Sequence, residues 1–129
     1  MPTPDSFDYA VIRVVPRVER GEVINAGVVL FCLQRDFLDA RVELDRNRLH
    51  ALDPNADVSL IEEHLRAIPR LCSGGADAGP LGALSRKERF HWLTSPRSTM
   101  LQPSPVHSGL CEDPRSALEH LLQTMVRPL

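Results

Sequence analysis

The stretch RGEVINAGVVLFCL, residues 20–33, decides the fold because it contains the most apolar run of the chain. Apolar side chains fall on both alternating faces of this run, which is typical of a central strand covered by other elements. We therefore predict a strand from about residue 22 to 33. Gly27 inside this strand indicates a bulge or the close approach of another backbone.

Two further strands are predicted beside this central one. Residues 7–15 alternate in polarity and end at Pro16, and residues 37–44 place apolar side chains on one face and polar ones on the other. Short connections make the three strands an antiparallel meander. Residues 97–102 are expected to form a fourth strand, and residues 103–111 a proline-rich loop.

Three helices and one helical turn are predicted from spacing and capping signals. Apolar residues from 58 to 72 recur at helical spacing, although Pro69 is expected to kink this helix or end it early. Ser85 and Glu88 form a capping box for a helix to about residue 93. Asp113 with Pro114 begins the last helix, and residues 45–52 suit a brief helical turn.

These elements predict an α+β fold. The expected architecture is a single domain over residues 1–129, in which an antiparallel sheet of three or four strands packs one face on two or three helices. The other face of the sheet is expected to contact water. Residues 1–6 are predicted to be a loose N-terminal segment, and residues 73–82 a glycine-rich loop.

Composition argues against several classes of protein. A chain of 129 residues with a net charge of −2 has no overall attraction to nucleic acid or anionic membranes. No apolar run approaches the roughly 20 residues that span a bilayer, and the polar N-terminus does not resemble a secretory signal. Three widely spaced cysteines suit a reducing environment, so we predict a cytoplasmic protein.

Several stretches resemble a known family. The pieces YAVIRVVP, RGEVINAGVVLF, ERFHWL, PRST and PVHSGL occur in order between about residues 9 and 127, and they are similar to domain of unknown function family 3037, a family of uncharacterised bacterial proteins. The resemblance implies a small cytoplasmic protein. It also implies, as a possible partner, a HipA-like kinase.

Polar residues in or near these pieces form the candidate binding site. Several arginines with a histidine would suit an anion such as a phosphate or a nucleotide, and they would converge if the last strand returned beside the first two. The candidate residues are Arg20, Glu22, Asn25, Arg89, Arg97, Ser98 and His107. The same residues could instead be structural, pairing at turns or completing backbone geometry.

Catalysis and metal binding have weaker sequence support. Ser98, His107 and Asp113, or Cys111 with His107, contain the residue types of a nucleophilic site, but neither set lies in a recognisable motif. The five histidines show no metal-ligand spacing, so no metal is predicted, and no cofactor is indicated.

Two functions remain open from the sequence. The first is a non-catalytic binding or accessory protein with a polar, anion-suited pocket, which would act with a partner protein or as a homodimer. The second is an enzyme acting on a phosphate-containing substrate or nucleotide. An apolar helix face left uncovered near the C-terminus, along residues 118–126, would favour a dimer or partner contact.

Overall fold

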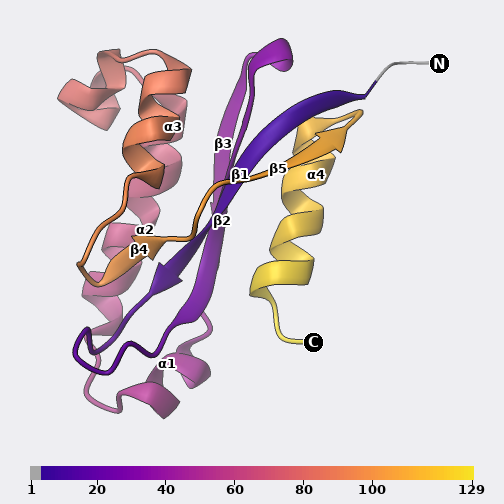
Figure 1. Ribbon diagram of the computed structural model, residues 1–129. Coiled ribbons are helices and arrows are strands. Elements are labelled where there is room, and N and C mark those ends of the chain that lie inside the picture. Colours follow the sequence, from indigo (N-terminus) through magenta and orange to yellow (C-terminus); the bar gives the residue numbers. More distant parts are fainter. Residues whose placement is uncertain (1–3) are drawn as a thin grey trace.

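The computed structural model describes residues 4–129, and its centre is one antiparallel sheet (Figure 1). The strand order is β3-β2-β1-β4, and β5 pairs with the other half of β1. The strands are β1 (Asp5–Val14), β2 (Ile24–Cys32), β3 (Phe37–Val42), β4 (Leu101–Pro103) and β5 (His107–Cys111). The predicted α+β class with an antiparallel sheet is therefore confirmed.

Four α-helices pack around this sheet. They are α1 (Arg46–Leu52), α2 (Val58–Ser73), α3 (Arg86–Thr94) and α4 (Pro114–Leu121), and a π-helical turn (Leu122–Val126) extends the last one. In the part of the chain that the structure describes, no helix is long and apolar enough to cross a membrane.

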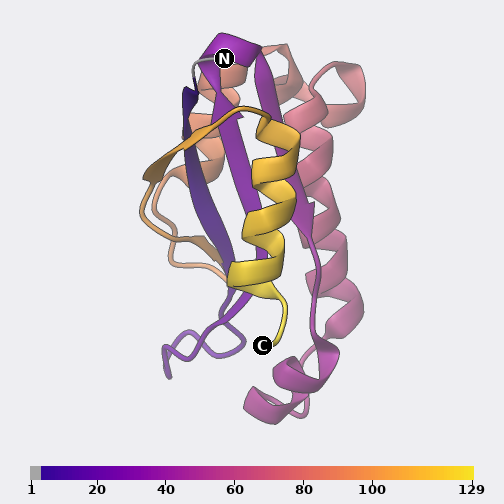
Figure 2. The ribbon, with the colours of Figure 1, turned by 90° about the vertical axis from the view of Figure 1, so that its right-hand side faces the viewer.

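Helices cover both faces of the sheet, so the expectation of one solvated face is wrong. Figures 1 and 2 show α2 and α3 on one side of the strands and α4 on the other. Val29 and Phe31 of β2 belong to the buried cluster with α2 and α3. Val28 and Leu30 belong to a second buried cluster with α4. The two apolar faces of β2 each require a cover, because leaving either in water would forgo its hydrophobic stabilisation.

The polar face of β3, which was predicted to contact water, forms ion pairs with α4. Asp39 accepts from Arg115 over 2.6 Å, and Arg41 donates to Glu119. Beyond β3, Glu43 accepts from Arg127 over 2.8 Å. These ion pairs are partly exposed, so each is expected to add little stability alone. Together they fix the position of α4 along the strand.

A bulge interrupts the pairing of β1 and β2 where glycine indicated one. Ile12 lies opposite Gly27, but the next pair joins Arg13 and Asn25, so Ala26 is the extra residue. A Cβ on Gly27 would lie 2.8 Å from the carbonyl oxygen of Arg41 in the neighbouring strand. Glycine is needed here because that backbone approaches so closely.

The bulge also shifts the side chains of β2 between faces. Simple alternation would put Ile24 and Ala26 on the same side as Val28. In the structure Ile24 and Ala26 pack with the α2 and α3 cluster, whereas Val28 packs with the α4 cluster. The extra residue at the bulge reverses the alternation beyond it.

Residues 101–111 form an interrupted edge strand, so the loop predicted for residues 103–111 is wrong. β4 is also shorter than the expected strand over residues 97–102. Buried Ser104 joins β4 to β5, because its hydroxyl accepts from Val11 N over 2.8 Å and its own N–H donates to Val11 O over 2.8 Å. A serine side chain thereby replaces a strand hydrogen bond beside Pro105.

The helix boundaries follow the capping signals more closely than the proline signal. Ser85 and Glu88 form the predicted capping box, and Asp113 caps α4. Pro69, however, lies inside α2, which continues to Ser73 and is capped by Asp57. The proline removes one backbone donor, but the buried face of α2 on both sides of it keeps the helix packed against the sheet.

Two predicted segments without regular structure are more ordered than expected. β1 already begins at Asp5, while residues 1–3 of the predicted loose segment lie outside the described residues. The glycine-rich segment contains two short 3-10 turns, Ala76–Ala78 and Pro80–Ala83. Gly75 N donates to Gly82 O over 3.1 Å and closes this segment on itself.

Replacing Ser104 should reveal its role in the edge strand. Ser104→Ala removes the acceptor of the buried Val11 N–H, so the free energy of unfolding should fall by roughly 1–3 kcal/mol. Urea denaturation followed by circular dichroism measures this change. Exposed Ser98 forms no side-chain hydrogen bond within residues 4–129, so Ser98→Ala is the matched control and should unfold like the wild type. Equal denaturation midpoints for the two variants would contradict the assignment.

Candidate functional site

Arg20 and Glu22 pair with each other in the loop between β1 and β2. The Arg20 guanidinium donates to the Glu22 carboxylate, and this contact raises the pKa of Arg20. Both side chains are exposed. The two side chains therefore neutralise each other at a turn, as predicted if these residues are structural.

Asn25 holds the C-terminal segment of the chain. Its side-chain amide donates to the backbone oxygen of Met125 over 2.9 Å. Met125 lies in the π-helical turn, so the bond connects the start of β2 with the end of the α4 segment. The Asn25 amide nitrogen is thus used within the fold.

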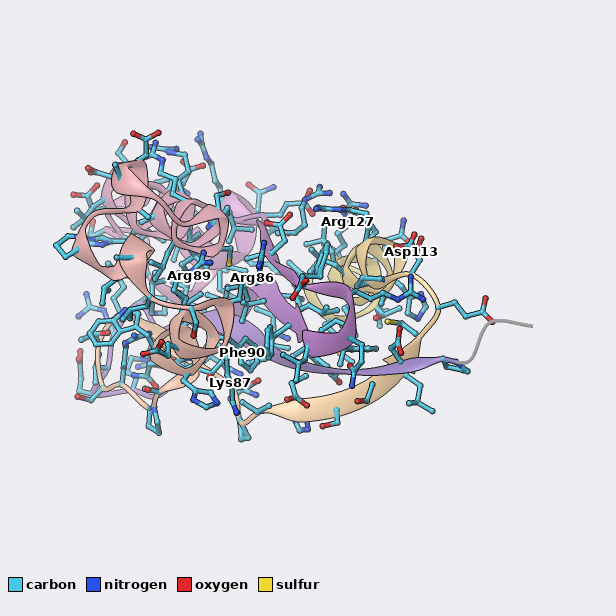
Figure 3. All side chains as sticks on the ribbon, turned by 90° about the horizontal axis from the view of Figure 1, so that it is seen from above. Arg86, Lys87, Arg89, Phe90, Asp113 and Arg127 are labelled. Atoms are coloured by element: carbon cyan, nitrogen blue, oxygen red, sulfur yellow. The ribbon has the colours of Figure 1, made fainter. Side chains whose placement is uncertain are left out.

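Arg89 is a structural residue at the end of α2. Its side chain is buried, with 7% of the residue exposed. Its guanidinium donates to Leu71 O over 2.9 Å, Cys72 O over 2.6 Å and Leu84 O over 3.1 Å. These carbonyls include two at the C-terminus of α2, where helical partners are missing. Figure 3 shows Arg89 between α3 and the α2 side, with Phe90 toward the sheet.

His107 lies on the α4 side of the sheet at the start of β5. Its ring packs on Tyr9, with the ring centroids 5.6 Å apart, and Tyr9 contacts the α4 cluster. In the register of β1 and β5, His107 lies opposite Tyr9. Val14, where β1 ends, is five positions beyond Tyr9, which is roughly 16 Å of strand.

The structure does not bring the candidate residues into one concavity. Arg20 and Glu22 lie in the β1–β2 loop, whereas His107 lies about halfway along β1. Arg89 and Arg97 belong to the α2 and α3 side of the sheet, opposite His107. Convergence depended on the last strand returning beside the first two, and in the structure β4 and β5 both pair with β1. The register of β5 on β1 places His107 away from the β1–β2 loop.

Arg97 is the candidate residue that lies in a groove. Its guanidinium stacks over the Trp92 ring at 5.2 Å from the ring centroid. It also donates to Trp92 O over 2.5 Å and to Leu93 O over 3.2 Å, at the C-terminal end of α3. Burial lowers the pKa of Arg97 from its usual value. No carboxylate forms an ion pair with Arg97 within residues 4–129.

The groove beside Arg97 is mostly apolar and has a volume of about 390 Å³. α2, the 3-10 segment, the end of α3 and β4 form its walls. Its main apolar side chains are Ile68, Leu71, Leu81, Trp92 and Leu101. A smaller cavity of about 20 Å³ shares Arg97 with the groove and reaches Ile12 of β1.

Sequence reasoning missed Trp92 as a site residue. The candidate set did not include this tryptophan, but 48% of the residue is exposed. A large exposed aromatic ring stacked by an arginine is typical of binding surfaces. The available signal was the WLTSPR segment, residues 92–97, in which the only tryptophan precedes Arg97 by five residues and a proline lies between them.

The catalytic combinations considered from sequence gain no geometric support. Cys111 is buried, and burial raises the pKa of its thiol, which disfavours the nucleophilic thiolate. The Asp113 carboxylate accepts from Ser116 and caps α4, and these contacts lower its pKa. Within residues 4–129, no group of three or more His, Cys, Asp or Glu side chains is placed to hold a metal ion.

Arg89 should prove essential for stability. Arg89→Met keeps the length of the side chain but removes the donors to three carbonyls, so unfolding should become easier by roughly 2–4 kcal/mol. Chemical denaturation measures this loss. Exposed Arg86 on the same helix is the matched control, and Arg86→Met should change little. If Arg89→Met were as stable as the control, the helix-end role of Arg89 would be refuted.

Buried Cys72 should make stability depend on pH in alkaline solution. Burial raises the pKa of its thiol from 9.0 to about 12. The unfolded chain therefore loses this proton first, and stability falls as pH rises from about 9 toward 12. At pH 10.5 this thiol should account for a loss of about 2 kcal/mol relative to pH 8.

The comparison with Cys72→Ala isolates this effect. The variant lacks the thiol, so its stability should decline less between pH 8 and 10.5, and the difference in slope reports Cys72 alone. Denaturation curves at several pH values give both slopes. Parallel curves for the two proteins would show that Cys72 titrates normally in the folded state.

Comparisons with known proteins identify the family. No curated protein and no solved structure matches the chain. A family model described as a protein of unknown function (DUF3037) matches residues 9–126. This match covers all five strands but for the first four residues of β1, together with all four α-helices. The chain therefore belongs to the DUF3037 family, as the resemblance of its sequence pieces predicted.

Proposed function

We propose that this protein is a non-catalytic binding or accessory protein whose site is the groove beside Trp92 and Arg97. Its ligand combines an apolar body with an anionic group. One observation carries the proposal: a guanidinium with no carboxylate partner among residues 4–129 stacks on a half-exposed tryptophan at the rim of an apolar groove.

The groove supplies the apolar part of this recognition. Its volume of about 390 Å³ falls within the range of small-ligand pockets. Ile68, Leu81 and Leu101 present hydrocarbon surface from three different elements. Covering such surface and the exposed Trp92 face is favourable because it removes apolar area from water.

Arg97 supplies the polar part. Two of its guanidinium nitrogens bond to carbonyls at the end of α3, which fixes the orientation of the group. A guanidinium has five N–H donors, so donors remain for a carboxylate or phosphate oxygen. Partial burial weakens competition from water, so an anion placed there would interact more strongly than at an exposed arginine.

Binding is better supported than catalysis by the contents of the groove. Besides Arg97, the titratable residue that lines the groove is His64. The nucleophile candidate Cys111 and the base candidate His107 belong to the opposite side of the sheet. The alternative, an enzyme acting on a phosphate-containing substrate, would need a reactive group near Arg97. The hydroxyl that lines the groove, that of Thr99, donates to Leu101 O and not to a general base.

A protein partner fits the same chemistry. A segment with an acidic residue next to a large apolar residue would satisfy both parts of the groove. The HipA-like kinase implied by the family resemblance remains a prediction on this basis. A reducing cytoplasmic location is part of the proposal, and the three free, buried cysteines support it.

The single tryptophan allows a direct test of the groove. The probes are 3-phenylpropionate and its neutral amide, 3-phenylpropionamide. Titration is followed by Trp92 fluorescence and by the indole N–H signal in a proton–nitrogen correlation spectrum. We expect both probes to shift the indole signal, with the carboxylate binding more tightly.

Arg97→Gln should lower the affinity for 3-phenylpropionate at least about tenfold and leave the affinity for the amide nearly unchanged, because only the anion uses the guanidinium. Exposed Arg70 on α2 is the matched control, and Arg70→Gln should bind both probes like the wild type. Thermal melts verify that each variant is folded. The proposal fails if neither probe moves the indole signal, or if Arg97→Gln binds the carboxylate as well as the wild type does.

A further inference from the structure

The edges of the sheet differ in how they are protected against pairing with another strand. β3 carries charged Asp39 and Arg41, and both of them contact α4. β4 ends at Pro103, and Pro105 follows two residues later. β5, by contrast, has the sequence HSGLC, with no proline, lysine, arginine or acidic residue. Charges and prolines are the usual protection of exposed edges, so β5 lacks it.

The outer edge of β5 is open. Its inner edge pairs with β1 from Asp5 opposite Cys111 to Tyr9 opposite His107. Within residues 4–129, no second strand pairs with β5. In Figure 2 the segment that contains β5 runs along the outer side of the strands. Leu110 on this strand is 71% exposed, which is unusual for a large apolar side chain beside free backbone groups.

We propose that a second copy of this chain occupies this edge. The two β5 strands pair antiparallel about a two-fold axis at Gly109, so His107 lies opposite Cys111 of the second copy. Ser108 then lies opposite Leu110 of the second copy. The pairing joins the two sheets into one continuous sheet and supplies partners for the outward backbone groups of both strands.

The side chains of β5 suit pairing with themselves. When His107 is neutral, no residue of the strand carries a charge, so the two copies meet without like-charge repulsion. On one face each Leu110 lies beside the small Ser108 of the second copy and diagonal to its Leu110, which covers both exposed leucines. At the axis Gly109 leaves room for Phe7, since a Cβ there would lie 2.6 Å from Phe7 Cζ.

Charge complementarity at the ends of the paired strands favours a second copy over an unrelated strand. Glu112 follows β5, is exposed, and forms no ion pair within residues 4–129. It lines the same groove as Leu110, Cys111 and Ala117, beside α4. His107 lies on the α4 side of the sheet. In the proposed register Glu112 falls opposite Val106 of the second copy and one position from its His107. The imidazole can reach the carboxylate from there and donate to it, and the contact occurs twice by symmetry.

Sedimentation equilibrium of the full chain tests the proposal. The wild type should show a concentration-dependent monomer–dimer equilibrium between about 1 and 500 µM. Leu110→Lys introduces a charge on each side of the axis and should raise the dimer dissociation constant at least about tenfold. The matched control is Leu60→Lys, because Leu60 is 42% exposed on α2, away from this edge. That variant should dimerise like the wild type.

Cross-linking tests the register separately. Ser108→Cys and Leu110→Cys chains are mixed and oxidised, and residues directly opposite each other should form a disulfide between the two chains. Leu60→Cys mixed with Leu110→Cys should not. The cross-link also tests the proposal if Leu110→Lys does not fold.

Three results would overturn the proposal: a wild type that stays monomeric over the whole range, a dimer equally stable in Leu110→Lys, or a cross-link with the Leu60 variant alone. The groove beside Trp92 lies on other elements, so binding of 3-phenylpropionate should be unchanged in Leu110→Lys. Failure of the dimer is thereby distinguished from failure of the proposed function.

Discussion

Covering both faces of β2 is the constraint on which the rest of the structure depends. Val28 and Val29, adjacent in sequence, are completely buried in different clusters. A strand of this kind needs an apolar layer on each side, since neither face can remain in water without losing a large part of the hydrophobic stabilisation. The chain meets this need by placing α2 and α3 on one face and bringing α4 back to the other.

The polar residues of the fold mostly serve this arrangement. Ion pairs between the β3 side and the C-terminal segment align α4, and the Asn25 amide fixes the end of that segment. Arg89 donates hydrogen bonds to the carbonyl oxygens at the end of α2. Within residues 4–129 no buried side-chain nitrogen or oxygen lacks a hydrogen-bond partner. A polar cluster in the sequence is therefore weak evidence for a site here, because the fold itself uses so many polar groups.

The two proposed interaction surfaces stand out because their groups are not used in this way. Arg97 has its carbonyl contacts but no carboxylate partner, and Leu110 has little cover on an unprotected strand edge. They lie on different elements and suit different occupants: an anion with an apolar body in the groove, and a second copy at the edge. A dimer would thus present two such grooves, one from each copy, without changing either.

The sequence by itself determined the class of the fold, the capping box of α3 and the glycine at the bulge. These features depend on local periodicity and on backbone chemistry within a few residues, as at Ser85 and Gly27. It did not determine the second helical layer, the strand at residues 107–111 or the separation of Arg20 from His107. Only the tertiary structure decided those, because the register of β5 on β1 is a long-range choice, set by buried Ser104 and by packing against both faces of the sheet.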